Sequence, residues 1–199
     1  MTRRRSSYRS LNSLQRDIAV CRACVEAGYP LESLPVRNLQ FGQRAYMYGQ
    51  APGVEEGKER RPWRGRAGKT LRRWLDMDED EFYATFYCAS VTRCFPGRDS
   101  TRGDRKPSPR EQELCEFWRD WELELLRPEL IVPVGILAIE RLLGIKGLAS
   151  CIGCVFEREG ATVIPLPHPS GASAWTSINR DLTERAAGLV RDEVARFQG

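Results

Sequence analysis

The stretch Gly49-Gln-Ala-Pro-Gly-Val-Glu-Glu56 carries an amide, two glycines and two carboxylates directly after the apolar run Ala45-Tyr-Met-Tyr48. That run is typical of a short buried strand. Glycine lets the backbone turn where a strand ends, and open α/β sheets bind their ligands at that edge. An ordinary strand-to-helix loop is the alternative interpretation. We take this stretch as the first candidate for a functional site.

His168 is the only histidine in the chain, so any imidazole chemistry must use it. It stands in Pro167-His-Pro-Ser-Gly171, at the end of a strand predicted over residues 161–166. A donor aimed at a developing negative charge contributes most in the transition state of a reaction. Because the two prolines fix its loop at a strand end, we expect His168 to be such a donor rather than a structural histidine.

Positive charge gathers next to the first stretch. Between Lys58 and Arg73 there are eight basic residues and one acid, and the predicted loop 92–109 is also basic. The N-terminus of a helix predicted over residues 67–75 offers free N–H groups that favour phosphate. A local basic face attracts a phosphate backbone, although the net charge is only +4. The side chains expected to contact phosphates are Arg61, Arg64, Arg66, Lys69, Arg98, Arg102 and Arg105.

The chain has seven cysteines, an odd count. In a reducing compartment such thiols are metal ligands or core residues more often than disulfides. Two Cys-x-x-Cys pairs occur, and by spacing alone they would suit a zinc site with four thiolate ligands. The pairs are Cys21 with Cys24 and Cys151 with Cys154.

Together with Arg61-Pro-Trp-Arg-Gly-Arg-Ala-Gly68, these features resemble the uracil-DNA glycosylase superfamily. The resemblance is closest to its iron-sulfur-containing branch, often called family 4. That branch carries a Gly-Glu-Ala-Pro-Gly-like first motif, a Gly-Arg-Pro-Phe-x-Gly-x-Ala-Gly segment, a late His-Pro motif and four cluster cysteines. The resemblance runs from about Cys21 to Trp175.

The resemblance implies a monofunctional DNA repair glycosylase. Such an enzyme turns a deaminated base out of DNA and hydrolyses its N-glycosidic bond, which initiates base excision repair. His168 and Gln50 would be catalytic, and Ser170 and Gly171 would contact DNA. Trp63 takes the position of a stacking Phe in relatives, with a core aromatic as the alternative. The base would be held by Gly49, Gln50, Ala51, Trp63 and Ser90.

The resemblance also implies that a 4Fe–4S cluster is bound by four thiolates and has a structural role. Its ligands would be Cys21, Cys24, Cys94 and Cys115. The interval between the last two is longer than usual in the family because of the basic loop. Zinc is the alternative metal. Cys88, Cys151 and Cys154 would then be packing residues or free thiols.

Two positions depart from the family pattern. The most efficient relatives place an acid in the first motif to position water, and this chain has Ala51 there. Water must then be oriented otherwise, or attack a largely formed oxocarbenium cation. The family's base-reading Asn falls at Ser90, whose hydroxyl cannot make the bidentate amide contact that tells uracil from cytosine. Uracil is the expected substrate, and hypoxanthine and xanthine are alternatives. The nearby Glu55 and Glu56 are expected to be solvated or paired with arginines.

The 199 residues, 41% of them apolar, suit one domain with a substantial core. We expect residues 11–199 to form this domain, and residues 1–10, with four arginines and three serines, to be a disordered basic tail. No apolar run reaches the roughly 20 residues that span a bilayer, and no hydrophobic segment follows the basic start. These features predict a cytoplasmic protein that binds no membrane. The resemblance implies a monomer whose partner is DNA with a damaged base.

Apolar residues at helical spacing predict helices over 11–20, 67–75, 111–126, 136–143 and 178–197. Buried strands are predicted over 45–48, 86–91, 130–134 and 161–166. Strands separated by helices indicate a parallel sheet with helices on both faces. The resemblance implies the same α/β class, a three-layer αβα sandwich with a central four-stranded parallel sheet. Both motif loops would emerge at one edge of that sheet.

A module that binds damaged or single-stranded DNA without catalysis is the rival from another class, since Ala51 and Ser90 could mark an inactive site. A zinc-stabilised scaffold with no DNA role is a third alternative. The joint presence of Gln50, Trp63 and His168 argues against both, because binding alone needs no oxyanion donor.

Overall fold

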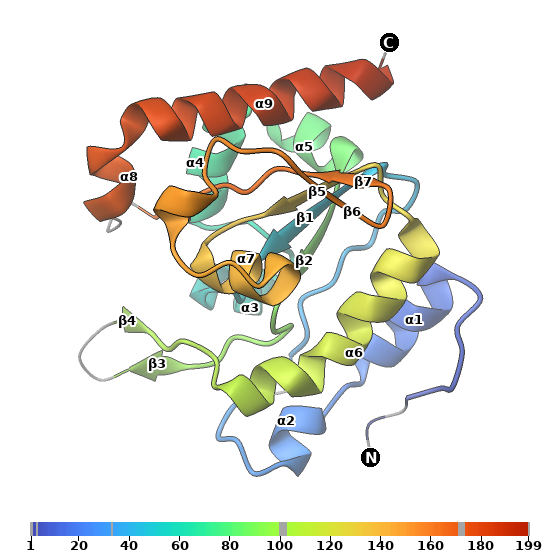
Figure 1. Cartoon of the computed structure of the whole chain (residues 1–199). Coiled ribbons are helices and arrows are strands. Elements are labelled where there is room, and N and C mark those ends of the chain that lie inside the picture. The colour runs from blue at the N-terminus through green and yellow to red at the C-terminus, as the bar shows by residue number, and fades with distance from the viewer. Residues whose placement is uncertain (1, 3, 33, 100–102, 171–173, 199) are drawn as a thin grey trace.

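The computed structural model describes residues 2, 4–32, 34–99, 103–170 and 174–198 (Figure 1). Its centre is a five-stranded sheet in the order β2-β1-β5-β7-β6. These strands are β1 (Ala45–Gly49), β2 (Phe86–Ser90), β5 (Leu130–Pro133), β6 (Phe156–Arg158) and β7 (Ala161–Val163). The pairs β1–β2, β1–β5 and β5–β7 are parallel, whereas β6 is antiparallel to β7. The four parallel strands confirm the predicted α/β fold. The fifth strand was not predicted, because it is short and only partly buried.

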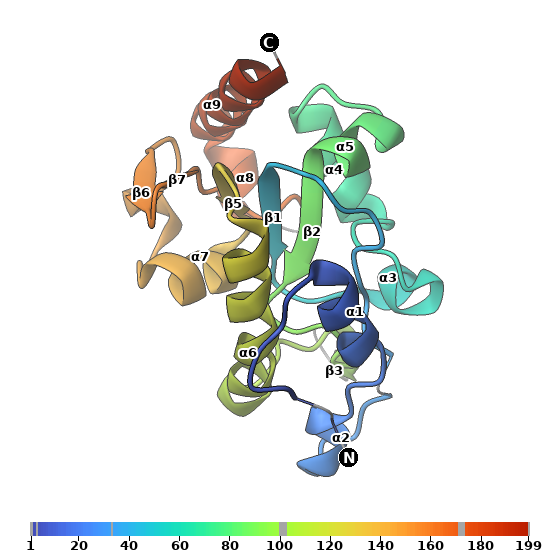
Figure 2. The ribbon, with the colours of Figure 1, turned by 90° about the vertical axis from the view of Figure 1, so that its right-hand side faces the viewer.

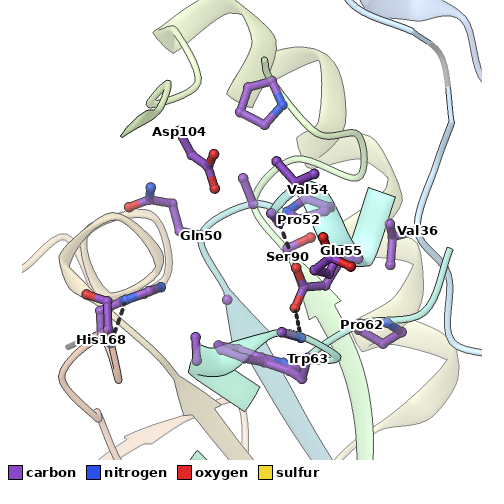
Figure 3. A pocket seen from close by; sticks show the side chains of 18 of the residues that line it. Val36, Gln50, Pro52, Val54, Glu55, Pro62, Trp63, Ser90, Asp104 and His168 are labelled. Carbon is purple, nitrogen blue, oxygen red and sulfur yellow. Dashed lines mark hydrogen bonds between the residues drawn. The ribbon is translucent and has the colours of Figure 1, made fainter. Parts of the chain in front are cut away.

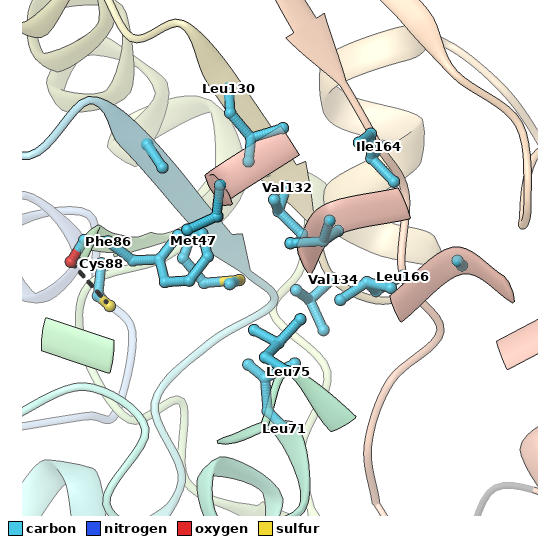
Figure 4. Packing of buried hydrophobic residues seen from close by; sticks show 14 of the residues in the cluster. Met47, Leu71, Leu75, Phe86, Cys88, Leu130, Val132, Val134, Ile164 and Leu166 are labelled. Atoms are coloured by element: carbon cyan, nitrogen blue, oxygen red, sulfur yellow. Dashed lines mark hydrogen bonds between the residues drawn. The ribbon is translucent and has the colours of Figure 1, made fainter. Parts of the chain in front are cut away.

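Successive side chains of β1 pack into two different cores, because the side chains of a strand point alternately to the two faces of the sheet. Met47 packs in one core with Val132 and with Leu71, Phe82 and Val190. That core, shown in Figure 4, is covered by three helices. They are α4 (Arg66–Trp74), α5 (Glu79–Thr85) and α9 (Arg180–Gln198).

The second core lies on the opposite face of the sheet. Tyr46 and Tyr48 of β1 pack there with Leu137 of α7 and with partly buried side chains of α1 and α6. These helices are α1 (Leu11–Ala19), α6 (Pro109–Leu126) and α7 (Ile136–Leu143). Helices on both faces make the three layers of the expected sandwich, which Figure 2 shows from the side.

Several short elements were not predicted. They are α2 (Ala23–Glu26), α3 (Val54–Glu59), α5, α8 (Ala174–Ile178) and the hairpin of β3 (Arg98–Asp99) with β4 (Gly103–Asp104). Caps define α5 more than apolar periodicity does: the Asp78 carboxylate accepts from the Glu81 N–H at 2.9 Å, and Glu81 accepts from the Asp78 N–H at 2.9 Å. Within the described ranges, no helix has the length and apolar character needed to cross a membrane.

The segment before α1 differs from the expected disordered tail at Tyr8, which is 5% exposed. Its ring contacts Trp121 edge-on with centroids 5.5 Å apart, and its hydroxyl donates to the Asp17 carboxylate at 3.1 Å. Arg5 pairs with the same carboxylate at 2.7 Å. Tyr8 thus packs this part of the segment against the domain, which the number of arginines and serines in the segment did not predict.

A buried charge lies between the second core and the loop that follows β2. Glu122 of α6 is fully buried and pairs with Arg93. The hydroxyls of Tyr46 and Tyr87 donate to its carboxylate at 2.8 and 2.9 Å, and Gln15 donates at 3.0 Å. Because a buried carboxylate is stable only when it is paired and hydrogen-bonded, this network fixes the start of the loop on α6.

Candidate active site

One cavity of about 420 Å³ opens where β1 and β2 end (Figure 3). Its lining includes every residue predicted to hold the base or to act in catalysis: Gly49, Gln50, Ala51, Trp63, Ser90 and His168. These residues come from the ends of two strands, the loop before α4 and the loop after β7. Parallel strands bring such loops to the same edge of a sheet.

Trp63 forms one wall of the cavity. It is 9% exposed, and a methyl group built on Gly49 would lie 2.8 Å from its ring. Its backbone adopts a left-handed conformation with φ of 57°, and Arg72 donates to its carbonyl oxygen at 3.0 Å. A methyl group on Gly68 would lie only 1.8 Å from the same oxygen. Two glycines and an arginine therefore fix Trp63, which is both buried and part of the cavity lining, and its role as a stacking aromatic stays a prediction.

We expect Gly68→Ala to disturb this wall strongly. The added methyl group must displace the Trp63 carbonyl, which breaks the Arg72 hydrogen bond and moves the indole. A loss of about 1–3 kcal/mol in the free energy of unfolding is expected, as for an overpacked core site. Urea unfolding monitored by tryptophan fluorescence would measure it. Gly188→Ala is the control, because its backbone is not left-handed and its added methyl group would meet only the end of the Arg191 side chain, at 3.6 Å. Equal losses in both variants would contradict the role of the close contact.

Glu56 joins the two motifs that flank the cavity. One of its oxygens accepts from the Gly53 N–H at 3.1 Å, and the other accepts from the Gly65 N–H at 2.7 Å. The structure thus corrects the expectation that Glu56 is solvated or paired with an arginine. Glu55 is exposed and pairs with Lys58 at 3.1 Å.

His168 lies opposite these contacts, on the side of the cavity where Figure 3 also shows Gln50. Its Nδ1 accepts from the Ser170 N–H at 3.3 Å, so a neutral ring carries its proton on Nε2. Burial lowers the pKa of His168, and the charge of Glu56 partly opposes that shift. Gly135 packs against the ring, since a methyl group there would lie 3.2 Å from the His168 Cβ. The imidazole is therefore oriented and neutral at pH 7.

The polar groups of the cavity differ in what they can still bind. The Ser90 hydroxyl donates to the Thr92 carbonyl oxygen at 2.7 Å, which leaves its oxygen as an acceptor. Within the described residues, the Gln50 side chain makes no hydrogen bond, so its amide can donate and accept. Ser170 also lines the cavity, whereas Gly171 lies outside the described residues.

The basic residues fall into three groups. Arg66 and Arg98 are exposed and line the cavity, and Lys69 is exposed on α4 outside it. Arg102 lies outside the described residues. The remaining predicted phosphate contacts are engaged in ion pairs: Arg61 and Arg64 with Glu79, Arg64 also with Glu59 at 2.6 Å, and Arg105 with Glu111 at 2.7 Å.

The four predicted cluster cysteines lie close enough to affect one another. The Cys24 thiol donates to the sulfur of Cys115, which lowers the pKa of Cys115 to about 7 and raises that of Cys24. Burial and the neighbouring Cys115 raise the pKa of Cys94 to about 12. Burial, followed by Cys115, also raises the pKa of Cys21. Electrostatic influence thus links four thiols that come from α2 and the residue before its cap, the loop after β2, and α6.

The alternative zinc set is not brought together. Cys21 belongs to the apolar cluster around Trp118, whereas Cys151 is buried in the core that contains Met47 and Ile152. Cys154 is exposed. Among the described residues, no group of three or more Cys, His, Asp or Glu side chains is arranged so that it could hold a metal ion. The ligand set of Cys21, Cys24, Cys94 and Cys115 therefore stays a prediction.

Sequence reasoning missed three residues that shape this site. Gly68 and Arg72 fix Trp63, and Asp104 of β4 brings a carboxylate to the cavity lining. The small residue at position 68 stood inside the quoted motif and could have signalled a close approach. Asp104 had no local signal, because only the hairpin carries it to the cavity.

The fold and the site define a class of protein, an αβα domain with a ligand cavity at the carboxyl edge of its parallel sheet. The chain belongs to the uracil-DNA glycosylase superfamily, since the family model described as "Uracil DNA glycosylase superfamily" matches residues 38–188. The membership predicted from the motifs is confirmed.

Several relatives are named "Type-4 uracil-DNA glycosylase". The protein of Archaeoglobus fulgidus is 28% identical over 173 residues, which cover 81% of this chain and 82% of the relative. That of Thermotoga maritima is 31% identical over 130 residues, 64% of this chain and 65% of the relative. That of Sulfurisphaera tokodaii is 26% identical over 130 residues, 63% of this chain and 54% of the relative. The chain thus spans only about half to two thirds of the length of the latter two.

Proposed function

We propose that the protein is a monofunctional DNA glycosylase that hydrolyses the N-glycosidic bond of a deaminated base turned out of DNA. One observation carries the proposal: Gln50, Trp63 and His168, from three separate segments, line one cavity of about 420 Å³. A flipped base needs its polar edge gripped, an apolar surface against its ring and a donor for the charge that develops as it leaves. The three side chains match these needs, and the relatives' names support the same activity.

The cavity's polar groups favour deaminated bases. The Gln50 amide can donate to a carbonyl oxygen of the base and accept from a ring N–H, and the indole of Trp63 offers an aromatic face. Because the Ser90 hydroxyl already donates to Thr92, its oxygen accepts from the base. Uracil, hypoxanthine and xanthine all have a ring N–H beside a carbonyl group. Uracil is the main substrate we propose, with the two purines as weaker ones.

His168 stabilises the leaving base. As the glycosidic bond breaks, its electron pair moves into the base and charge gathers on a carbonyl oxygen. A neutral imidazole with its proton on Nε2 can donate to that oxygen, and the Ser170 N–H holds Nδ1 in the matching tautomer. The lowered pKa of His168 keeps the ring in this form at neutral pH.

The DNA backbone would follow the exposed basic rim of the cavity. Arg66 and Arg98 are exposed and border the cavity, so they are the best-placed phosphate contacts. Arg61 and Arg64 shape the loop through Glu79 rather than face solvent freely. We place Lys69 and Ser170 in a secondary role on the same face.

We propose a 4Fe–4S cluster held by Cys21, Cys24, Cys94 and Cys115 rather than zinc. The convergence of four thiols, three of them buried, supports a four-thiolate donor set. When bound, the cluster supplies a structural crosslink between α2, the loop after β2 and α6. The chain's own contribution is the Cys24 to Cys115 hydrogen bond, which favours a thiolate at Cys115.

Incubation of the purified protein with oligonucleotides that contain uracil, hypoxanthine, xanthine or no damaged base tests the function. Alkaline cleavage then reveals abasic sites. We expect cleavage at uracil in single turnover, weaker cleavage at the purines and none in the undamaged strand. Tight binding without cleavage of any damaged strand would instead identify a binding module.

A further inference from the structure

The cavity lacks an obvious group to handle the attacking water, because neither Gln50 nor Ala51 carries a carboxylate. Three carboxylates do line the cavity: Glu55, Glu56 and Asp104. Both oxygens of Glu56 accept backbone N–H groups, at 3.1 and 2.7 Å, so this side chain is a structural clasp. Glu55 is exposed and pairs with Lys58 at 3.1 Å. Only Asp104 is left to act on water.

Asp104 closes the β3–β4 hairpin, opposite Arg98. A methyl group built on Gly53 would lie 3.4 Å from Oδ2 of Asp104, so the carboxylate stands over the first motif. Figure 3 shows the side chain on the same side of the cavity as Gln50. Within the part of the chain that the structure describes, it has no hydrogen bond or ion pair, and its oxygens are open to water.

The residue that follows fixes the hairpin. Arg105 donates from its backbone to the Gly97 carbonyl at 2.9 Å and from Nε to the Pro96 carbonyl at 3.0 Å. Both of its terminal nitrogens bind the buried Glu111, each at 2.7 Å. The loop that lengthens the interval between Cys94 and Cys115 is therefore anchored by Arg105, and it carries the Asp104 carboxylate to the cavity. Arg105 also lines the cavity, and its ion pair with Glu111 makes it an anchor of the hairpin.

We propose that Asp104 is a catalytic residue that binds and orients the hydrolytic water. The inference rests on the proposed glycosylase function. The bond between C1′ and the base nitrogen breaks, with its electron pair moving to the base. The water oxygen bonds to C1′, its proton moves to the Asp104 carboxylate, and that proton then returns to solvent as the anionic base takes one up. The products are an abasic site and the free base.

A carboxylate beside DNA phosphates lowers affinity, since like charges repel across the short distances of a binding face. A residue that served only to bind DNA would therefore be basic or neutral at this position. Removal of the Asp104 charge should slow the reaction and strengthen DNA binding. A residue that serves only structure would change neither in that way.

Single-turnover excision of uracil by Asp104→Asn tests the inference. General base and water-positioning groups contribute typically about 10²–10⁴-fold, so we expect a rate at least about 10²-fold below the wild type. The dissociation constant for uncleaved DNA should be equal or lower. Asp104→Glu, which keeps a carboxylate, should recover part of the rate. Glu55→Gln removes the same charge from an ion-paired, exposed side chain and should keep the wild-type rate.

The outcomes separate the two proposals. If the wild type excises uracil and Asp104→Asn does so within about threefold, the role of Asp104 is overturned while the glycosylase function stands. If Glu55→Gln loses as much rate as Asp104→Asn, charge alone is responsible and the water site is overturned. If the wild type excises no base, both proposals fail. Thermal unfolding of each variant shows whether the fold is intact.

Discussion

His168→Ala is expected to lower the single-turnover rate of base excision by about 10²–10³-fold, the usual loss for one oxyanion donor. DNA affinity should change little, because the imidazole acts on charge that appears only in the transition state. The Ser170 N–H would lose its acceptor at Nδ1, but that amide lies in a half-buried loop and can be hydrated. Rapid-quench assays with uracil-containing DNA would measure the rate.

The pH profile separates the donor from a structural histidine. Because burial lowers the pKa of His168, the ring stays neutral below the ordinary imidazole pKa of about 6.5. The neutral ring therefore contributes to the rate and to the free energy of unfolding at pH values above about 6.5. Both contributions are lost as the pH falls through the lowered pKa of His168, because Nδ1 then gains a proton and loses the Ser170 hydrogen bond. A well-folded His168→Ala protein that excises uracil at the normal rate would rule out this mechanism.

Cys115→Ala is expected to have the second large effect, a loss of bound iron and of most soluble protein. Cys115 is buried beside Cys24, and its thiol is the one whose pKa is lowered to about 7. Removal of one of the four proposed ligands would leave the proposed cluster with an open site. Iron analysis and the broad absorbance near 400 nm expected for iron-sulfur proteins would follow the loss.

Cys154→Ala serves as the matched control because Cys154 is an exposed thiol in the other Cys-x-x-Cys pair. It should keep iron, colour and yield. Equal iron loss in the two variants would show that the ligand set is wrong. A colourless wild type with one equivalent of zinc would assign the four thiols to zinc instead.

The sequence predicted the parallel sheet well because its strands carry their signal locally. β1 and β5 are buried along their whole length, so continuous apolar runs mark them. The apolar periodicity of α6 was equally clear. The helix begins two residues before the predicted start, after a capping box formed by Ser108 and Glu111. By contrast, α5 and the β3–β4 hairpin are short and polar, and their caps and backbone pairing leave little periodicity to detect.

The residues of the cavity could be predicted from the motifs, and the six that were predicted to hold the base or to act in catalysis all line it. What could not be predicted was how each side chain is engaged. Glu56 looked like a surface acid, yet it accepts from the N–H of Gly53, three residues before it, and from the N–H of Gly65, nine residues after it. The charge of Arg105 suggested phosphate binding, but its partner Glu111 reaches it only through the fold. Such pairings depend on tertiary geometry and leave no mark on residue type.

The Glu56 clasp changes the electrostatic character of the cavity. The helix predicted over residues 67–75 was expected to offer free N–H groups to phosphate. In the structure, the N–H groups of Gly53 and Gly65, which directly precede α3 and α4, both donate to the Glu56 carboxylate. An internal anion thus fills the place where two helix ends would otherwise draw an external one. A carboxylate in this position makes the interior of the cavity less favourable for a phosphodiester than for a neutral ring. In the proposed glycosylase, the Glu56 contacts would favour entry of a base over entry of the sugar-phosphate backbone.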